Sequence, residues 1–321
     1  MRNASMAALV MLAVACTASA QQPYPVKPVR IIVPFSPGGG NDLIGRNVAQ
    51  KLNEAWGQPM IVENRTGGSG NIGTDFVAKA APDGYTLLVG YVGNFAINPF
   101  LFSKLPYDPV RDFTPITLAA AFTNLLVSHP SMPVKTVKEL VAFAKARPGQ
   151  VNYASAGVGA VGHMAAELLA TTAQIRIQHI PYKGNGAAIA DVLGGQVPLI
   201  FSAPGAVIGH VRTGRLRALA TASARRPPGL ADVPTFAEAG FPGVEASGWF
   251  AIFGPAAMPR PLVERLNAEI IKSLMASDVH ARLTNAGYDP TTTTPEQLAE
   301  FLKSELAKWG KVVKASGAKV D

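Results

Sequence analysis

Pro34-Phe35-Ser36-Pro37-Gly38-Gly39-Gly40-Asn41-Asp42 lies where a predicted strand passes directly into a predicted helix. It ends an apolar, β-branched run that predicts a strand at 29–35 and leads into a helical pattern at 42–56. The three consecutive glycines allow the backbone to turn its amides inward, and Asn41 or Asp42 can cap the helix. Amides at a helix N-terminus hold a carboxylate or a phosphate without a cationic side chain. A plain glycine-rich connector is the alternative.

The same order of strand, glycine-rich loop and helix recurs in the second half of the chain. Tyr153-Ala154-Ser155-Ala156-Gly157-Val158-Gly159-Ala160-Val161-Gly162-His163 lies between a predicted strand at 151–154 and a predicted helix at 163–171. Two such loops, one in each half, can face each other and hold a ligand at both ends. His163 is a candidate contact to that ligand, and a capping or packed histidine is the alternative.

Short apolar runs alternate with helical patterns along the chain, which predicts an α/β fold with largely parallel sheets flanked by helices. The predicted strands are 29–35, 60–63, 85–91, 151–154, 178–181, 197–202, 216–221 and 248–254. The predicted helices are 42–56, 136–146, 163–171, 186–193, 261–275 and 295–315.

The strands fall into two groups on either side of a Pro- and Asp-rich stretch at 106–112, so we expect two lobes. The last helices need a sheet to cover, and the second lobe already has its own helices, which places them back on the first lobe. We expect lobe 1 at 21–124 and 248–321, and lobe 2 at 125–247. Two chain crossings suit a hinge, because a few residues can absorb the rotation between lobes.

Residues 1–20 are typical of a secretory signal peptide. Arg2 precedes an apolar run and small residues, and Ala18-x-Ala20 is a cleavage motif. The run is too short to cross a bilayer, although a retained anchor is an alternative. Lipidation at Cys16 is another alternative, but Leu12 stands one place too early for the usual lipoprotein signal. We expect cleavage after Ala20 and a periplasmic protein.

Composition narrows the possible functions. Charged residues make up 16% of the chain and hydrophobic ones 48%, which indicates a globular protein. Cys16 is the only cysteine, so the mature chain has no disulfide, thiol nucleophile or cysteine metal ligand. The formal net charge is +8, but the positive residues are dispersed, which favours an attraction for anionic solutes over nucleic-acid binding.

Catalytic and cofactor motifs give no support for an enzyme. Residues 68–73 and 157–162 match G-x-G-x-x-G, but the following strands lack the acidic residue that holds a ribose. The five histidines are isolated from one another and from acidic neighbours at metal-ligand spacing. We therefore expect no catalytic residue, no metal and no cofactor, with an exported enzyme of unassigned chemistry as the less favoured alternative.

Ordered matches from about Tyr24 to the C-terminus carry a resemblance to a known family. They include Val33-Pro34-Phe35-Ser36-Pro37-Gly38-Gly39, and the stretches at 62–65, 80–88, 105–109, 152–157, 181–184 and 193–197. The chain resembles the Bug-type receptors, which are the extracytoplasmic solute-binding proteins of tripartite tricarboxylate transporters. This resemblance implies a two-lobed periplasmic-binding-protein fold of the type II-like form that closes on a small organic carboxylate. Membrane transporter subunits are the implied partners, and we expect a monomer. A ligand sensor that signals to a membrane partner is the alternative.

The resemblance also implies the site residues, because in this family the two glycine-rich loops hold one carboxyl group. Carried over by motif, the ligand-binding residues are Phe35, Pro37, Gly38, Gly39, Asp42, Ala156, Gly157, Gly159 and His163, with Asn94 and Tyr182 as weaker candidates.

Departures from the family pattern bear on the ligand. Two positions that are often acidic are Pro198 and Ser202 here, and Ser202 lies at a predicted strand end that can face the cleft. Their loss disfavours an amino acid as the ligand, since no acidic partner meets its ammonium group. Val158 and the Ala160-Val161 pair imply a more apolar pocket, which suits an aliphatic or an aromatic acid.

Overall fold

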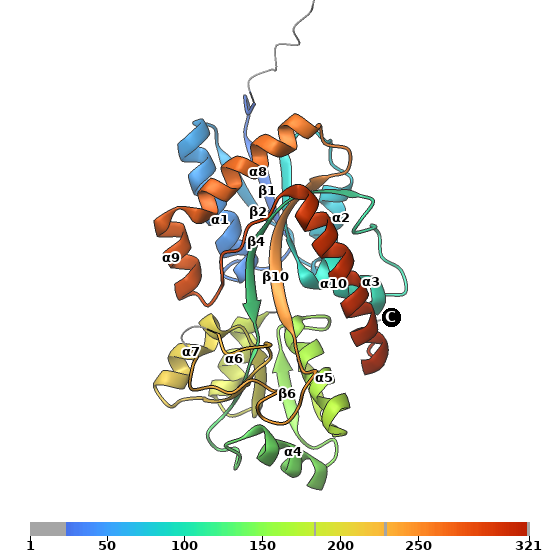
Figure 1. Cartoon of the computed structure of the whole chain (residues 1–321), viewed down its shortest axis with the longest axis vertical. Coiled ribbons are helices and arrows are strands. Elements are labelled where there is room, and N and C mark those ends of the chain that lie inside the picture. The colour runs from blue at the N-terminus through green and yellow to red at the C-terminus, as the bar shows by residue number, and fades with distance from the viewer. Residues whose placement is uncertain (1–23, 183, 228–229, 320–321) are drawn as a thin grey trace, which may run out of the picture.

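The computed structural model of the chain describes residues 24–182, 184–227 and 230–319. The predicted signal peptide and Cys16 lie outside the described residues. Two five-stranded sheets with flanking helices lie one beyond the other along the long axis of the molecule (Figure 1). We call the part around the first sheet lobe 1 and the part around the second sheet lobe 2. No helix in the described ranges has the length and apolar character needed to cross a membrane.

The sheet of lobe 1 has the strand order β2-β1-β3-β10-β4. Strand β1 runs parallel to β2 and β3, whereas β10 runs antiparallel to β3 and β4. The apolar run of β1 is almost wholly buried, as expected for a strand covered on both faces. The five strands are β1 (Val29–Val33), β2 (Met60–Asn64), β3 (Thr86–Tyr91), β4 (Phe113–Thr123) and β10 (Ser247–Pro255).

The helices of lobe 1 cover the sheet from two sides. Helices α1 and α8 pack together on one side, and α10 packs with α3 and η2 on the other (Figure 1). A capping box at Thr294 starts α10, and α10 also contacts α5 of lobe 2. The helical elements are α1 (Gly40–Trp56), η1 (Gly68–Gly70), α2 (Asn71–Ala78), η2 (Gly93–Ile97), α3 (Asn98–Leu101), α8 (Arg260–Met275), α9 (Ser277–Asn285) and α10 (Pro295–Ser316).

The sheet of lobe 2 has the strand order β7-β6-β8-β5-β9. Strand β6 runs parallel to β7 and β8, and β5 runs antiparallel to β8 and β9. Its strands are β5 (Leu125–Ser128), β6 (Asn152–Ser155), β7 (Gln178–Pro181), β8 (Leu199–Ser202) and β9 (Arg217–Thr221). Its helices are α4 (Val137–Ala146), α5 (Val161–Ala173), α6 (Asn185–Leu193) and α7 (Pro204–Arg212).

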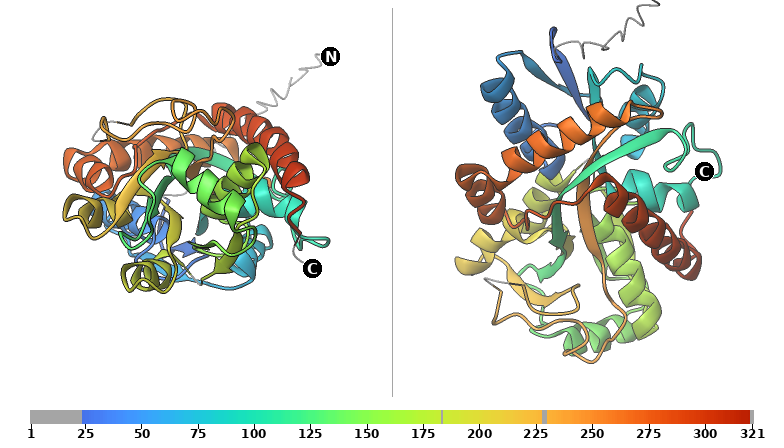
Figure 2. Two further views of the ribbon diagram at one scale, coloured as in Figure 1. Left: turned by 90° about the horizontal axis from the view of Figure 1, so that it is seen from below. Right: turned by 45° about the horizontal axis from the view of Figure 1, so that its top comes forward.

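The chain passes between the sheets at two adjacent places. Strand β4 ends at Thr123 and β5 begins at Leu125, so Asn124 alone separates them. On the way back, β10 begins at Ser247, which lies opposite Thr123 in the β4–β10 ladder. Figure 2 shows both segments running through the waist of the molecule. In each sheet four strands run the same way and one strand, β10 or β5, runs against its neighbours, so the largely parallel sheets that the sequence predicted each contain one antiparallel strand.

Candidate functional site

The first glycine-rich loop follows β1 and is fixed by the carboxylate of Asp42. Gly38 has φ +86°, a conformation that favours glycine, and donates its N–H to Asp42 Oδ2 at 3.0 Å. Arg46 Nε and Asn64 Nδ2 donate to the same carboxylate at 2.9 and 3.0 Å. Burial acts to raise the pKa of Asp42, but these donors outweigh burial and the pKa lies below its ordinary value. Both carboxylate oxygens are therefore occupied within lobe 1.

The start of α1 presents backbone amides at the end of this loop. The first helical hydrogen bond runs from Leu43 N to Gly39 O, at 2.9 Å. The N–H groups of Gly40, Asn41 and Asp42 have no acceptor among the residues that the structure describes. The Asn41 side chain donates to Val89 O at 2.9 Å and holds the helix start against β3. These amides and the positive end of the helix dipole together form a place for an anion.

The second glycine-rich loop is shaped by a serine and two histidines. Ser155 Oγ accepts the Gly157 N–H at 3.1 Å and lies 2.7 Å from His179 Nε2. Gly159 N donates to His163 Nδ1 at 3.3 Å, and the rings of His163 and His179 stack 4.1 Å apart. Burial, with a smaller contribution from His179, lowers the pKa of His163 to about 3. Burial also lowers the pKa of His179 to about 4, so both rings are neutral near pH 7 and Nδ1 of His163 can accept.

The start of α5 resembles the start of α1. The N–H groups of Gly162 and His163 have no acceptor within the described part of the chain, and the first helical bond runs from Met164 N to Ala160 O. A Cβ on Gly162 would lie 2.4 Å from Phe201 O, so a glycine is required for α5 to start directly on the end of β8. The first residue of α5, Val161, donates its N–H to the Tyr91 hydroxyl of lobe 1.

Tyr91 belongs to a cluster of aromatic rings at the lobe junction, which we call the aromatic floor. Its ring lies 5.5 Å from that of Phe35 and 5.6 Å from that of Phe250. Phe250 in turn contacts Phe122 and Tyr288 at 5.1 and 5.4 Å. Burial raises the pKa of Tyr288 to about 12, so its hydroxyl stays neutral. Of these five residues, only Phe35 was predicted from the sequence. The signal that could have found Tyr91 is its position at the end of a predicted strand, two residues before Gly93.

A hollow of about 260 Å³ lies between the lobes next to the first loop. Lobe 1 contributes the loop and the start of α1 to its walls, and lobe 2 contributes Gly205 and Ala206 at the start of α7. The lobes meet closely beside it, because a Cβ on Gly205 would lie 1.5 Å from Ala286 O. The residues that line it are Gly38, Gly39, Asp42, Leu43, Arg46, Gly205, Ala206, Ala286 and Tyr288.

Most of the sequence-predicted site residues gather at this junction. Gly38, Gly39 and Asp42 line the hollow, Pro37 is exposed in the same loop, and Phe35 is part of the aromatic floor. The second loop meets lobe 1 directly: Ser69 Oγ donates to Val158 O at 3.3 Å. Ala156, Gly157 and Gly159 lie in that loop, and the His163 side chain supports it from behind.

Only three of the twelve predicted site residues line the hollow, and of the nine others three have partners of their own elsewhere. Asn94 is fully buried in η2, where its side chain bonds to Tyr91 N and to Thr74. Tyr182 donates its hydroxyl to Asp191 Oδ2 at 2.6 Å, within lobe 2. Ser202 is 1% exposed at the end of β8, and its hydroxyl lies 3.5 Å from Ala203 O. Each hydroxyl or amide thus has a local partner.

The described residues bring no three His, Cys, Asp or Glu side chains into an arrangement that could hold a metal ion. Two helix N-termini supply amide donors for an anion, and the aromatic floor supplies apolar surface.

Known proteins share both the sequence and the fold. Residues 44–318 match the family described as "Tripartite tricarboxylate transporter family receptor". The chain is 38% identical over 307 residues to the UPF0065 protein in the tcbD-tcbE intergenic region of Pseudomonas sp. (strain P51), covering 95% of this chain and 91% of the relative. It is also 38% identical over 298 residues to BugT of Bordetella pertussis, covering 92% of this chain and 91% of BugT.

Solved structures agree with these relatives. An R. palustris protein solved with adipate is 35% identical, with a TM-score of 0.88, and covers 93% of this chain and 100% of its own. MatC of Rhodopseudomonas palustris with bound malate is 34% identical, with a TM-score of 0.84, and covers 90% of this chain and 100% of its own. The periplasmic binding protein BugD is 31% identical, with a TM-score of 0.84 over 92% of this chain and 99% of BugD. The chain therefore belongs to the family of tripartite tricarboxylate transporter receptors, which are solute-binding proteins of the periplasm.

Proposed function

We propose that the chain captures a small organic acid between its lobes and delivers it to the membrane subunits of a tripartite tricarboxylate-type transporter. The observation that carries this proposal is the pair of strand–glycine loop–helix units, β1–α1 and β6–α5. Each leaves amides at its helix start without an acceptor among the described residues, and α5 starts on Tyr91 at the lobe junction. One carboxyl group of the ligand would take the amides of Gly40 to Asp42 and of Gly162 and His163. Charge-assisted hydrogen bonds to amides hold a carboxylate without a cation.

The hollow favours a short, unaminated acid. Its volume of about 260 Å³ is small for a ligand pocket, and the aromatic floor borders it through Tyr288. Asp42 is the only carboxylate among its lining residues, and Gly38, Arg46 and Asn64 already occupy that carboxylate. An ammonium group on the ligand would find no free acidic partner there. The adipate and malate of the two similar structures are dicarboxylates without an amino group.

Export, lobe boundaries and the hinge complete the proposed receptor. The signal at 1–20 would export the chain to the periplasm, where it would act as a monomer. The lobes would comprise 21–124 with 248–321, and 125–247. The crossings at Asn124 and between Ala246 and Ser247 would then act as the hinge, because each joins the two sheets through very few residues.

Thermal shift and calorimetry on the purified mature chain test this function. The panel pairs adipate with its dimethyl ester, glutarate with glutamate, and malate with aspartate. We expect each free acid to raise the melting temperature more than its ester or amino counterpart. A ligand that binds only the folded state adds about 2.7 kcal/mol at a hundredfold excess over Kd. Failure of every carboxylate to stabilise the protein, or steady consumption of a bound acid followed by NMR, contradicts a receptor.

A further inference from the structure

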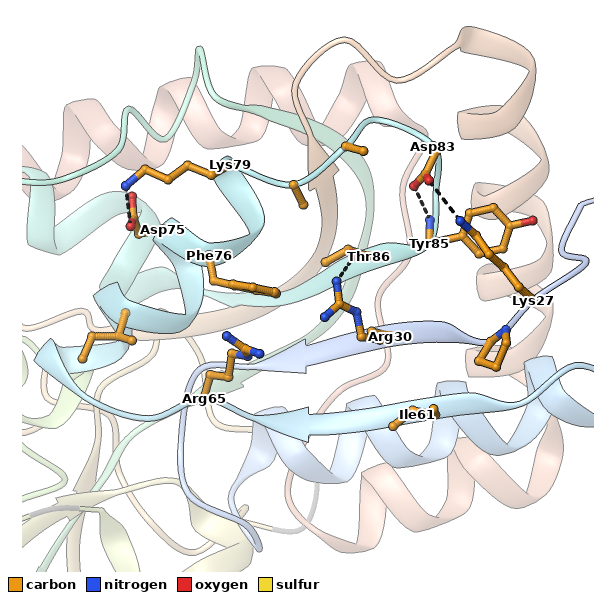
Figure 3. Close-up of a pocket in the computed structure, with 14 residues that line it drawn as sticks. Lys27, Arg30, Ile61, Arg65, Asp75, Phe76, Lys79, Asp83, Tyr85 and Thr86 are labelled. Atoms are coloured by element: carbon orange, nitrogen blue, oxygen red, sulfur yellow. Dashed lines mark hydrogen bonds and ion pairs between the residues drawn. The ribbon is translucent and has the colours of Figure 1, made fainter.

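A second hollow lies on the outer side of lobe 1, away from the two glycine-rich loops. Its volume is about 720 Å³, and we call it the outer groove. Helix α1 packs on β2 from one side of the sheet, whereas α2 packs on β1 and β3 from the other. Figure 3 shows the groove between α2 and the neighbouring strands β1 and β2. Since β2 is the edge strand of the sheet, the groove is open along that edge.

The outer groove is rich in positive charge. Four cations line it, Lys27, Arg30, Arg65 and Lys79, against the two carboxylates of Asp75 and Asp83. Lys79 pairs with Asp75 at 2.7 Å, and Lys27 lies 3.6 Å from Asp83. Arg65 pairs with Glu63 of β2 at 2.7 Å, whereas Arg30 donates to Thr86 Oγ1 at 3.2 Å and has no carboxylate partner among the described residues. With Glu63 counted, four cations face three carboxylates, and the positive charge that remains attracts carboxylates.

The two arginines of the outer groove both lie against one aromatic ring. The Arg65 guanidinium lies 3.6 Å from the centroid of the Phe76 ring, and the Arg30 guanidinium lies 5.2 Å from it. Figure 3 shows both arginine side chains directed toward Phe76. A guanidinium held on a ring loses less rotational freedom when it binds an acid, which strengthens binding.

Apolar side chains flank these cations. Ile61 of β2 is 48% exposed and Ile72 of α2 is 59% exposed, and both line the outer groove. A small organic acid can cover only part of two exposed isoleucines. They do add binding energy when a protein segment covers them, and protein interfaces typically combine apolar and aromatic side chains with arginine.

We infer that the outer groove docks an acidic protein segment that also carries apolar side chains and belongs to the membrane partner of this receptor. The inference rests on the proposed function for the identity of the partner. The acidic side chains would meet Arg30, Arg65 and the flanking lysines, and the apolar side chains would cover Ile61 and Ile72. Such a contact leaves the hollow between the lobes free, because no residue lines both that hollow and the outer groove.

A labelled peptide of alternating Glu and Leu tests the groove directly by fluorescence anisotropy, with a Lys-Leu peptide for comparison. We expect the Glu-Leu peptide alone to bind, and added salt to weaken it. Ile61→Asp combined with Ile72→Asp should weaken it by about tenfold or more, and so should Lys79→Glu. Val110→Asp is the control for an exposed apolar residue, and Lys303→Glu is the control for a helical lysine in a 2.7 Å ion pair. Both controls should bind as the unchanged protein does.

Three results overturn this inference: no binding of the Glu-Leu peptide, equal losses in the controls, or displacement of the peptide by adipate, which would make the groove a small-acid site. The adipate-induced thermal shift, measured on every variant, separates this outcome from the proposed function. If adipate produces no thermal shift in the unchanged protein, the proposed function as a dicarboxylate receptor is contradicted. The peptide measurements, in contrast, test only the outer groove.

Discussion

The hydroxyl oxygen of Tyr91 in lobe 1 accepts the backbone N–H of Val161 in lobe 2, with an N···O distance of 3.2 Å. Tyr91 is the last residue of β3 and Val161 is the first residue of α5. One hydrogen bond thus joins a strand end in one lobe to a helix start in the other. Because its partners sit on different lobes, the bond forms only when the lobes come together.

Replacing Tyr91 with Phe keeps the ring in the aromatic floor and removes this acceptor. The buried N–H of Val161 then loses its partner, which disfavours the closed form by about 1–3 kcal/mol. We expect a larger radius of gyration in solution scattering without ligand, and adipate binding about tenfold weaker. Tyr85→Phe is the matched control, because the Tyr85 hydroxyl also accepts a backbone N–H, from Val26 at 3.0 Å, but within lobe 1. Equal adipate affinity in both variants would show that the bond does not support closure.

Gly159 and Gly149 have nearly the same φ, so replacing each with alanine distinguishes the effect of backbone strain from the effect of a contact between the lobes. Gly159 has φ +77° and Gly149 has φ +75°. A Cβ on Gly159 would lie 2.9 Å from Asn98 Oδ1 of lobe 1, whereas a Cβ on Gly149 would meet nothing within 4 Å. Alanine at either position strains the backbone by about 1–3 kcal/mol. We expect similar losses in urea unfolding for both, but weaker adipate binding by about tenfold or more only for Gly159→Ala. Unchanged affinity in that variant would mean that the second loop tolerates separation from Asn98.

Asp42→Asn should loosen the first loop. An asparagine is neutral and cannot accept hydrogen bonds at both positions. Gly38, Arg46 and Asn64 therefore lose a charged acceptor, at least one of them loses its hydrogen bond, and urea unfolding shows a loss of about 1–3 kcal/mol near neutral pH. The pKa of Asp42 is lowered in the folded protein, so its stabilisation is present above the ordinary pKa and is lost as pH falls toward the folded value. The difference between the two proteins should therefore shrink in acid. The exposed Asp278, which pairs with Lys51 and Arg282, supplies the comparison, and Asp278→Asn should change stability less.

The stacked histidines predict acid sensitivity of the folded state. His163 and His179 have pKa values of about 3 and about 4 in the folded protein, below the ordinary value of 6.5. The unfolded chain therefore takes up protons first, so stability is full above about pH 6.5 and falls as pH drops toward 4. In the variant with both histidines changed to Asn, the amide at 163 can still accept the Gly159 N–H, and no imidazole titrates there. We expect a lower stability at neutral pH but a shallower acid slope in urea unfolding. An unchanged slope would contradict burial of two neutral rings.

The sequence predicted part of this fold and missed the strands that connect the lobes. Every predicted strand overlaps an observed one, but β4 and β5 were not predicted. The stretch that forms β4 contains Pro115 and three consecutive alanines, residues that strands disfavour. β4 forms because it is an edge strand, where a proline is tolerated, and because it pairs with β10 along its whole length. That pairing joins residues far apart in the chain, and no local pattern contains it.

Part of the candidate site could likewise be predicted from the sequence, and part could not. Gly38, Gly39 and Asp42 could be predicted because a glycine loop before a helix is a local pattern. The aromatic floor could not, since its rings come from separate elements and meet only through sheet pairing, as when Phe250 of β10 lies opposite Tyr91 of β3. For Ser202 the position at a strand end was predicted, but the environment of its side chain was not. The side chain is buried and has a partner within lobe 2.

The two crossings between the lobes run side by side as a paired ribbon. Ser247 lies opposite Thr123 at its end, and just beyond it Asn124 Nδ2 donates to Ala246 O at 3.3 Å. Two bonded strands cannot slide along each other without breaking their ladder, but they bend and twist together. Rocking or twisting of the lobes about this ribbon is therefore allowed, whereas sliding of one lobe past the other is disfavoured. We expect the receptor to adapt to a longer acid by opening to a wider angle, and not by a sideways shift of one lobe.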